Sequence, residues 1–407
     1  MSVFQPFGVL LPSHGVSVSW PVIACDQFTS EPEYWENVRR VVGTDVSTLA
    51  LIFPEVWLGK DDASRIGAIE NTMCSYLKNA VLTSYPASFV YVERTLCTGA
   101  IRRGVVGTVD LEAYDFSEKT DKPIRATEKT VRSRIPPRVA IRKGASLELS
   151  HVLLLADDPT DRLLSGLEQK KTRFPKLYDL DLMLGGGHLV GYLVSGDEAA
   201  EFSLAVADYE KERATLGTLL YCVGDGNHSL ATAKTCYEDL KTRLTPNSAK
   251  DHPARYAMVE LGNIRDDSLV FEPIHRLVVG ENPETVLSQL KKTAGASDGH
   301  RITWIAGSKT GEIILDRKFG VLPVAALQSA LDACLPEIGA ELDYIHGEAS
   351  LRKLAQEENR LGFLLTAIAK EDFFTGVALG GVFPRKTFSM GEATDKRYYT
   401  EVRRIVR

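Results

Sequence analysis

Residues 188–244 alternate between strand-like and helix-like segments, and this alternation constrains the fold more than any other feature of the sequence. The apolar runs 188–195 and 218–223 are each followed by a segment whose apolar residues recur at helical spacing, 196–214 and 229–244. Strands that alternate with helices indicate sheets covered by helices. We therefore expect an α/β (α+β) fold built from mixed-sheet domains.

The chain has 407 residues, enough for two or three domains of roughly 100–200 residues each. The pattern suggests an N-terminal α/β domain at 1–145, a central domain at 146–280, and a C-terminal α/β segment at 281–407 that packs back on the core. The strongly charged stretch 118–142 precedes the first boundary, and 280–301 is the best candidate for the second.

Composition excludes several classes of protein. Apolar residues make up 44% and charged residues 25%, as in ordinary globular proteins, and the net charge of −6 offers no basic excess for nucleic acid. No apolar run approaches the roughly 18 residues that span a bilayer, and the N-terminus does not resemble a secretory signal. Six cysteines stand singly, which argues against a zinc ribbon or a disulfide framework. We expect a cytoplasmic protein with no nucleic-acid or membrane partner, and leave open whether it forms a homo-oligomer.

The sequence "GDGNHS" at 224–229 joins a strand-like run to a helix and is the main candidate site. Glycines allow positive φ, and the first amides of the following helix can bind an anion such as phosphate. His228 could donate to that phosphate, while Asp225 could be a general base or hold a cation. In the alternative, Ser229 or Asn227 simply caps the helix. The predicted phosphate site comprises Gly224, Asp225, Gly226, Asn227, His228 and Ser229.

This turn matches neither of the common phosphate-binding fingerprints. Gly224 and Gly226 lack the third glycine of G-x-G-x-x-G, because Ser229 stands in its place, and no Walker sequence is present. A second glycine-rich element at 183–190 contains three glycines followed by His188. It is either a ligand loop or a flexible hairpin turn.

Two basic segments, 125–138 and 385–397, offer groups that suit phosphate or carboxylate ligands. Glu128 lies within the first and is either a base or an ion-pair partner. The alternative for both segments is a solvated charged surface. The predicted binding residues outside the turn are His188, Arg125, Glu128, Arg134, Arg138, Arg385, Lys386, Lys396 and Arg397.

Cys25 ends a strand-like run and could be the nucleophile of a hydrolase if a histidine lay beside it, although a buried structural cysteine is the alternative. The next segment predicts a helix with Ser30 as its N-cap. Histidines are dispersed without a metal-binding spacing. Glu272 and His275 could contribute to a site, with a structural histidine as the alternative.

Several long motifs occur together in one order: "WPVIACDQFTSEPEYW", "IRATEKTVRSRIPPR", "LYDLDLMLGGGHLVGYL", "GDGNHSLATAK", "HPARYAMVEL", "FEPIHR", "DYIHGE" and "PRKTFSMGEATDKRYY". In these motifs the chain resembles, over nearly its whole length, the bacterial and archaeal family called domain of unknown function 1015. More distantly, the GDGNHS turn is similar to the D-G-x-H-R turn of ParB/sulfiredoxin-like proteins, which include a kinase of free serine.

This second resemblance implies a ParB/sulfiredoxin-like central domain in which Gly226, Asn227 and His228 cradle a nucleotide phosphate and Asp225 lies near the reacting groups. Ser229 replaces the arginine of that superfamily, so a cation from 125–142 or 385–397 would have to substitute for it. The expected function is a small-molecule phosphotransferase, such as a kinase of free serine or a similar hydroxylated metabolite. Its expected cofactors are ATP or ADP and Mg²⁺ at Asp225. The alternative is a nucleotide-binding regulatory module without turnover.

Overall fold

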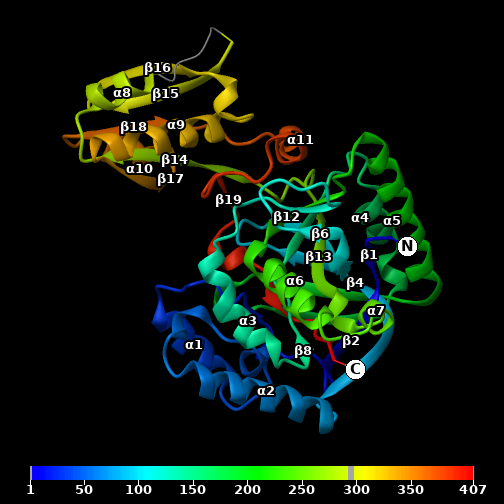
Figure 1. The fold of residues 1–407 in the computed structure, drawn as a ribbon. Coiled ribbons are helices and arrows are strands. Elements are labelled where there is room, and N and C mark those ends of the chain that lie inside the picture. The colour runs from blue at the N-terminus through cyan, green and yellow to red at the C-terminus, as the bar shows by residue number, and fades with distance from the viewer. Residues whose placement is uncertain (1, 292–297, 407) are drawn as a thin grey trace. The chain divides into compact units, whose positions relative to one another are not determined.

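The computed structural model describes residues 2–291 and 298–406, which divide by their contacts into two compact units (Figure 1). Unit 1 contains the residues up to 126, residues 130–269 and the residues from 392 onward. Unit 2 contains residues 127–129 and 270–391. This division differs from the three consecutive segments expected from the sequence, because the C-terminal residues belong to the first unit. The expected α/β class with mixed sheets is confirmed.

Unit 1 is built on an 11-stranded sheet with the order β10-β11-β4-β5-β13-β9-β12-β7-β6, in which β1 also pairs with β5 and β2 with β4. The pairs β13–β9, β12–β7 and β6–β7 are parallel, and the other pairs are antiparallel. Strands from before and after residue 145 thus share one sheet. The strands are β1 (Phe4–Gln5), β2 (Phe7–Pro12), β4 (Leu82–Thr95), β5 (Ile101–Asp110), β6 (Tyr114–Asp115), β7 (Ile124–Ala126), β9 (Leu153–Ala156), β10 (Lys176–Asp181), β11 (His188–Val194), β12 (Tyr221–Asp225) and β13 (Tyr256–Asn263).

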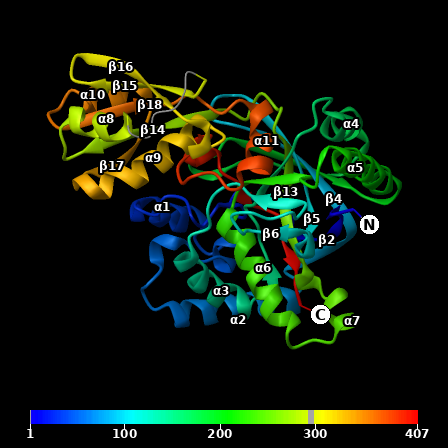
Figure 2. The ribbon, with the colours of Figure 1, turned by 45° about the horizontal axis from the view of Figure 1, so that its top comes forward.

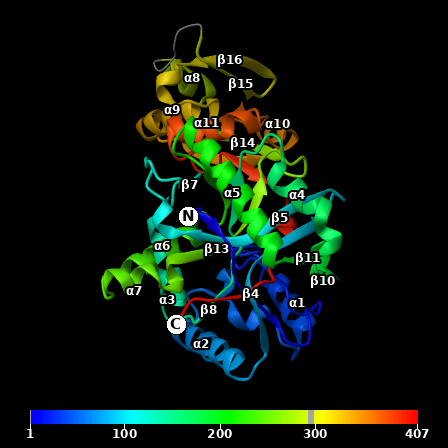
Figure 3. The same cartoon turned by 90° about the vertical axis from the view of Figure 1, so that its right-hand side faces the viewer.

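The two faces of this sheet carry separate hydrophobic cores, because successive strand residues point to opposite faces. On β4, Phe89 and Tyr91 join a core with helices α4, α5 and α6, whereas Val90 and Val92 join a core with α1 (Figure 3). The helices of unit 1 are α1 (Pro32–Val42), α2 (Asp62–Lys78), α3 (Ile135–Lys143), α4 (Arg162–Lys170), α5 (Gly196–Leu216), α6 (Asn227–Lys241) and α7 (Pro246–Lys250). Two short ladders, β3 (Val22–Ile23) with β20 (Tyr398–Tyr399) and β8 (Leu147–Glu148) with β21 (Arg403–Arg404), attach the C-terminal segment to earlier parts of unit 1.

The strands and helices expected between 188 and 244 are confirmed as β11, α5, β12 and α6, with ends shifted by a few residues. The predicted cap of the first helix is wrong. Glu31, not Ser30, is the N-cap of α1, and its side chain makes no capping hydrogen bond. Pro32 at the start of the helix already removes one amide that a cap would satisfy.

Unit 2 contains a six-stranded sheet with the order β16-β15-β18-β14-β17, and β19 pairs with β14 (Figure 2). Helices α8 and α9 pack on one core of this sheet, and α10 on another. The predicted boundary at 280–301 includes residues 292–297, which lie outside the described residues. Within the part of the boundary that precedes residue 292, residues 283–291 form α8. The elements are β14 (Phe271–Val279), α8 (Pro283–Lys291), β15 (His300–Ala306), β16 (Lys309–Leu315), α9 (Pro323–Ile338), β17 (Glu341–His346), α10 (Glu348–Leu354), β18 (Arg360–Leu364), α11 (Lys370–Gly380) and β19 (Phe388–Met390).

None of the described helices combines the length and the apolar composition that crossing a bilayer requires. All six cysteines lie in the described part of the chain and are unpaired thiols.

Candidate functional site

The glycine turn predicted to bind phosphate lies at the junction of β12 and α6. Asp225 ends the strand, and Gly226 adopts the left-handed conformation with φ of 77° and ψ of 26°. A Cβ on Gly226 would lie 2.9 Å from the Cα of Val152, so glycine is required by space as well as by conformation. Gly226 is itself the N-cap of α6, and Asn227 and Ser229 lie inside the helix. The alternative in which Ser229 or Asn227 caps the helix is therefore wrong.

Lys396 supplies a cation at this turn. Its Nζ lies 2.9 Å from Oδ2 of Asp225, whose Oδ1 accepts a hydrogen bond from the Gly226 amide at 2.8 Å. Burial alone would lower the pKa of Lys396, but Asp225 raises it above its ordinary value, so the ammonium stays charged. Of the two basic segments, the C-terminal one thus brings an ammonium group to the start of α6.

Asp26 and His151 form a second charged pair next to the turn. Nε2 of His151 lies 3.5 Å from Oδ2 of Asp26, and Nδ1 lies 2.7 Å from the hydroxyl of Tyr399. A Cβ on Gly226 would come within 3.4 Å of Cδ2 of His151, which shows how closely the ring packs on the turn.

Strand pairing explains why these residues meet. The ladder between β3 and β20 sets the segment of Asp26 beside that of Lys396, and the amide of Ala24 donates to the carbonyl of Arg397 at 2.9 Å. Strand β9 runs antiparallel to β12, with Leu153 opposite Asp225, so His151 just before β9 reaches the turn. Sequence reasoning missed Asp26 and His151 as site residues. Asp26 had a signal, a polar residue ending a buried strand, whereas His151 had none without knowledge of the pairing.

The pairing of Asp26 with His151 favours the charged form of both side chains, although burial opposes it. Burial alone would raise the pKa of Asp26, but His151 beside it lowers it well below the ordinary range. Burial alone would lower the pKa of His151, but Asp26, with Asp225 and Glu55 further away, raises it above its ordinary value. The start of α6 is therefore surrounded by two carboxylates, an imidazolium and an ammonium.

This pair predicts a specific pH dependence of stability. Folding raises the pKa of His151. Its contribution to the free energy of unfolding is therefore fully present below the pKa of the unfolded state, about 6.5, and is lost as the pH rises through the pKa of the folded state. Folding lowers the pKa of Asp26. Its contribution to the free energy of unfolding is therefore present above about pH 4 and is lost as the pH falls through the pKa of the folded state. We expect urea midpoints of the wild type to fall above neutral pH more steeply than those of His151→Gln. Parallel curves between pH 5 and 9 would contradict the pairing.

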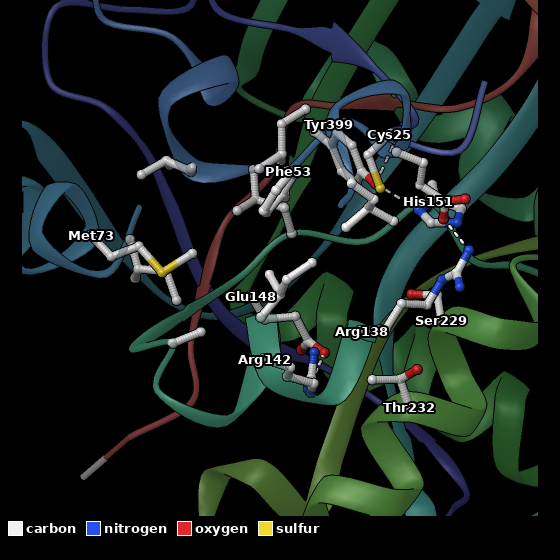
Figure 4. Close-up of a pocket in the computed structure, with 18 residues that line it drawn as sticks. Cys25, Phe53, Met73, Arg138, Arg142, Glu148, His151, Ser229, Thr232 and Tyr399 are labelled. Carbon is white, nitrogen blue, oxygen red and sulfur yellow. Dashed lines mark hydrogen bonds and ion pairs between the residues drawn. The ribbon is translucent and has the colours of Figure 1, made fainter. Parts of the chain in front are cut away.

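His228 and Arg138 lie at the same end of α6. Nε2 of His228 accepts a hydrogen bond from the amide of Val131 at 3.1 Å, so this nitrogen anchors the segment that leads into α3. Arg138 forms an ion pair with Glu55 and donates to the carbonyl of Arg134 at 2.7 Å. Figure 4 shows Arg138 beside Ser229, with His151 and Tyr399 nearby.

Other predicted residues of unit 1 contact groups outside the glycine turn. Arg125 donates to Thr218, which precedes the start of β12, whereas the turn follows its end. Arg397 is buried in ion pairs with Glu260 and Glu401. Arg134 is exposed at the N-cap of α3.

His188 begins β11, and its ring contacts Asp179 and Asp181 of the neighbouring strand at 2.8 and 2.7 Å. Four strands separate β11 from β12 in the sheet, a distance of roughly 24 Å at about 4.8 Å per strand. The glycines before His188 form the β10–β11 hairpin turn, in agreement with the hairpin alternative.

The remaining predicted residues belong to unit 2. Glu128 forms a β-bridge with Phe383, and Arg385 and Lys386 are exposed and accept hydrogen bonds from Arg276 through their carbonyls. His275 is buried and its Nδ1 accepts from the amide of Leu365 at 3.1 Å, as in the structural alternative. Glu272 pairs with His346 at 2.5 Å.

The Cys25 thiol does not support a hydrolase. Burial raises its pKa to about 12, and it accepts a hydrogen bond from the hydroxyl of Tyr399 at 3.1 Å. A thiol of such high pKa is protonated near neutral pH and is a poor nucleophile. Tyr399 instead links Cys25 to His151 and thereby fixes the orientation of the imidazole.

Within residues 2–291 and 298–406, no group of three or more His, Cys, Asp or Glu side chains is arranged to hold a metal ion. A divalent cation at Asp225 would therefore take most of its ligands from water and from the oxygens of a bound phosphate. Mg²⁺ is commonly bound in this way, by one or two carboxylates together with substrate phosphates. The residues present fit such an ion only together with a phosphorylated ligand.

A family model described as "Protein of unknown function (DUF1015)" matches residues 4–357. The chain belongs to the DUF1015 family. The predicted family membership is thus confirmed, whereas no curated protein matches this DUF1015 chain.

Three solved structures are similar to this DUF1015 protein at low identity. A variant of free serine kinase in complex with ADP has 13% identity and a TM-score of 0.38, covering 72% of this chain and 91% of that one. A conserved hypothetical protein from Pyrococcus furiosus has 12% identity and a TM-score of 0.34, and the match covers 74% of this chain and 94% of that one. C-terminally truncated SbnI from Staphylococcus aureus has 11% identity and a TM-score of 0.35, and the match covers 70% of this chain and 82% of that one. Likenesses of this size establish neither a shared ligand nor a shared activity.

Proposed function

We propose that this DUF1015 protein is a nucleotide-dependent phosphotransferase that acts on a small hydroxylated metabolite such as an amino acid related to serine. One observation carries the proposal: Lys396, Asp225 and the Asp26–His151 pair converge on the glycine turn at the start of α6. Phosphoryl transfer needs little covalent chemistry from the protein. It needs a nest for phosphate, a cation and a positioned carboxylate.

Each group has a role in this proposal. The amides in the first turn of α6, from Asn227 to Ser229, would bind phosphate oxygens of ATP or ADP, since helix N-termini favour anions. The ammonium of Lys396 would neutralise the phosphate charge that the arginine neutralises in ParB/sulfiredoxin-like proteins. Asp225 would hold Mg²⁺ at the phosphate, and the ion would lower the charge on the transferred group.

In the proposed reaction, one bond to phosphorus forms and one breaks. The hydroxyl oxygen of the metabolite bonds to the terminal phosphorus, and the bond from that phosphorus to the bridging oxygen breaks. The nucleotide leaves with one phosphate fewer, and the hydroxyl proton passes to the carboxylate of Asp26 late in the transfer, once the bond to phosphorus has made that proton acidic enough for a carboxylate of low pKa to accept. The imidazolium of His151 orients Asp26 and is therefore a positioning residue. The similarity of the GDGNHS turn to the D-G-x-H-R turn gives this proposal further support.

The test is turnover with a mixture of acceptors. Incubation with ATP or ADP, Mg²⁺ and a pool of free amino acids and small alcohols is expected to yield a phosphorylated product detectable by mass spectrometry. Asp26→Asn should retain nucleotide affinity but lower kcat by roughly 10²–10⁴-fold, the usual contribution of a general base. Nucleotide binding without any product would instead favour a regulatory module, and the absence of nucleotide binding would refute both.

A further inference from the structure

We propose that the acceptor of this phosphotransferase is a hydroxylated compound with an uncharged apolar body of about six carbon atoms, which occupies a cavity beside the start of α6. The inference rests on the proposed function and names the substrate class of that same site. It follows from the walls of the cavity, the pairing of its charges and its size.

The cavity lies in unit 1 between the segment 51–58, helices α2, α3 and α6, and strand β8 (Figure 4). Its walls are mostly aliphatic or aromatic, and several of these side chains belong to the hydrophobic core around α2. The apolar lining residues are Leu51, Ile52, Phe53, Leu58, Met73, Ile141, Ala145, Leu147 and Leu149.

One end of the cavity reaches the proposed reacting groups. Ser229, in the first turn of α6, and His151, the partner of Asp26, both line it. Tyr399 lines the same end and contacts His151. A molecule whose apolar body fills the cavity could therefore present a hydroxyl at this end, next to His151, the partner of the carboxylate that would accept its proton.

The charged side chains of the wall are paired with one another. Arg138 pairs with Glu55, and Nη2 of Arg142 lies 2.6 Å from Oε1 of Glu148, which Arg403 also contacts at 2.9 Å. Each guanidinium group that faces the cavity, those of Arg138 and Arg142, thus already contacts a carboxylate. A ligand carboxylate or ammonium placed there would have to disrupt one of these pairs, at the cost of leaving its partner buried. The wall therefore favours an uncharged ligand body.

The size sets the length of that body. The cavity has a volume of about 130 Å³, somewhat below an apolar cavity of roughly 150 Å³ that holds benzene. Free serine, with a single side-chain carbon, would leave this volume unfilled. Each methylene group transferred from water into such a site increases affinity by about fourfold.

The experiment compares acceptors that share the reacting hydroxyl and differ in the apolar body. With ATP and Mg²⁺, kcat/KM for β-phenylserine is expected to exceed that for serine by at least about tenfold, the gain from roughly two buried methylene groups. Equal or faster turnover of serine would overturn the proposal. In parallel, binding of benzyl alcohol to the full-length protein is measured by ligand-observed NMR, which requires no turnover.

Variants whose larger side chains fill the cavity test whether benzyl alcohol binds there. Ala145→Leu should abolish the binding of benzyl alcohol, whereas Ala140→Leu, at an exposed position of α3, should not. Leu58→Trp, at a half-buried position of the wall, gives a second filling variant should Ala145→Leu fail to fold. Absence of benzyl alcohol binding in the wild type, or binding unaffected by filling, would overturn the cavity site. Specific binding of benzyl alcohol without phosphorylation of any acceptor would support the cavity as an apolar ligand site but refute the phosphotransfer.

Discussion

Lys396→Met is expected to weaken the binding of ATP by roughly tenfold to a hundredfold, the effect of losing a hydrogen bond to a charged group. Lys396 forms an ion pair with Asp225 at the start of α6, and methionine would retain most of its aliphatic stem. Isothermal titration at fixed ionic strength measures the change, because phosphate binding depends on salt.

The control is Lys78→Met, which removes an exposed lysine at the end of α2 and leaves the formal net charge equal to that of Lys396→Met. It should bind ATP as the wild type does. The Lys396→Met change also leaves the carboxylate of Asp225 without its cation. The double variant Lys396→Met with Asp225→Asn removes this unpaired charge, and it therefore separates the loss of the ammonium from the effect of the unpaired carboxylate. If Lys396→Met and Lys78→Met bind ATP equally well, Lys396 does not bind the phosphate.

Gly226→Ala is expected to abolish measurable nucleotide binding and to lower the free energy of unfolding by roughly 2–5 kcal/mol. About 1–2 kcal/mol of this comes from a non-glycine residue in the left-handed region, and about 1–3 kcal/mol from crowding in a packed interior. The second part arises because the new Cβ would meet the backbone of Val152 at 2.9 Å, which a side-chain rotation cannot relieve. The resulting shift would move the first amides of α6 and the neighbouring His151.

Gly196→Ala is the matched control, since Gly196 begins α5 with φ of 58°. Among the residues that the structure describes, none outside this helix and the chain neighbours of Gly196 has an atom within 4 Å of the new Cβ. This variant should show only the conformational part of the destabilisation and retain nucleotide binding. Urea unfolding and ATP titration of both variants make the comparison. Equal losses of stability would show that the contact with Val152 is unimportant, and retained binding in Gly226→Ala would remove the turn from the site.

Much of the local structure could be predicted because it depends on neighbouring residues. The β12–α6 junction followed from an apolar run, two glycines and helical spacing, all within 224–241 and the residues just before. The N-cap of α1 was placed one residue early because Pro32 and the acidic residues around it offer several equivalent starts. Arg125 and His188 could not be located from sequence, since their positions depend on which strands neighbour one another.

The sequence by itself determined the α/β class, the family and the glycine turn, because each is encoded in short stretches of residues with a fixed spacing. The tertiary structure decided which charges accompany the turn. Lys396 reaches Asp225 through the pairing of β20 with β3, and His151 reaches Gly226 through the antiparallel pairing of β9 with β12. The strand pairings behind these contacts join residues far apart in the sequence, such as Ala24 and Arg397. Strand pairing over such separations depends on burial and hydrogen bonding of the whole sheet, so no local pattern reveals it.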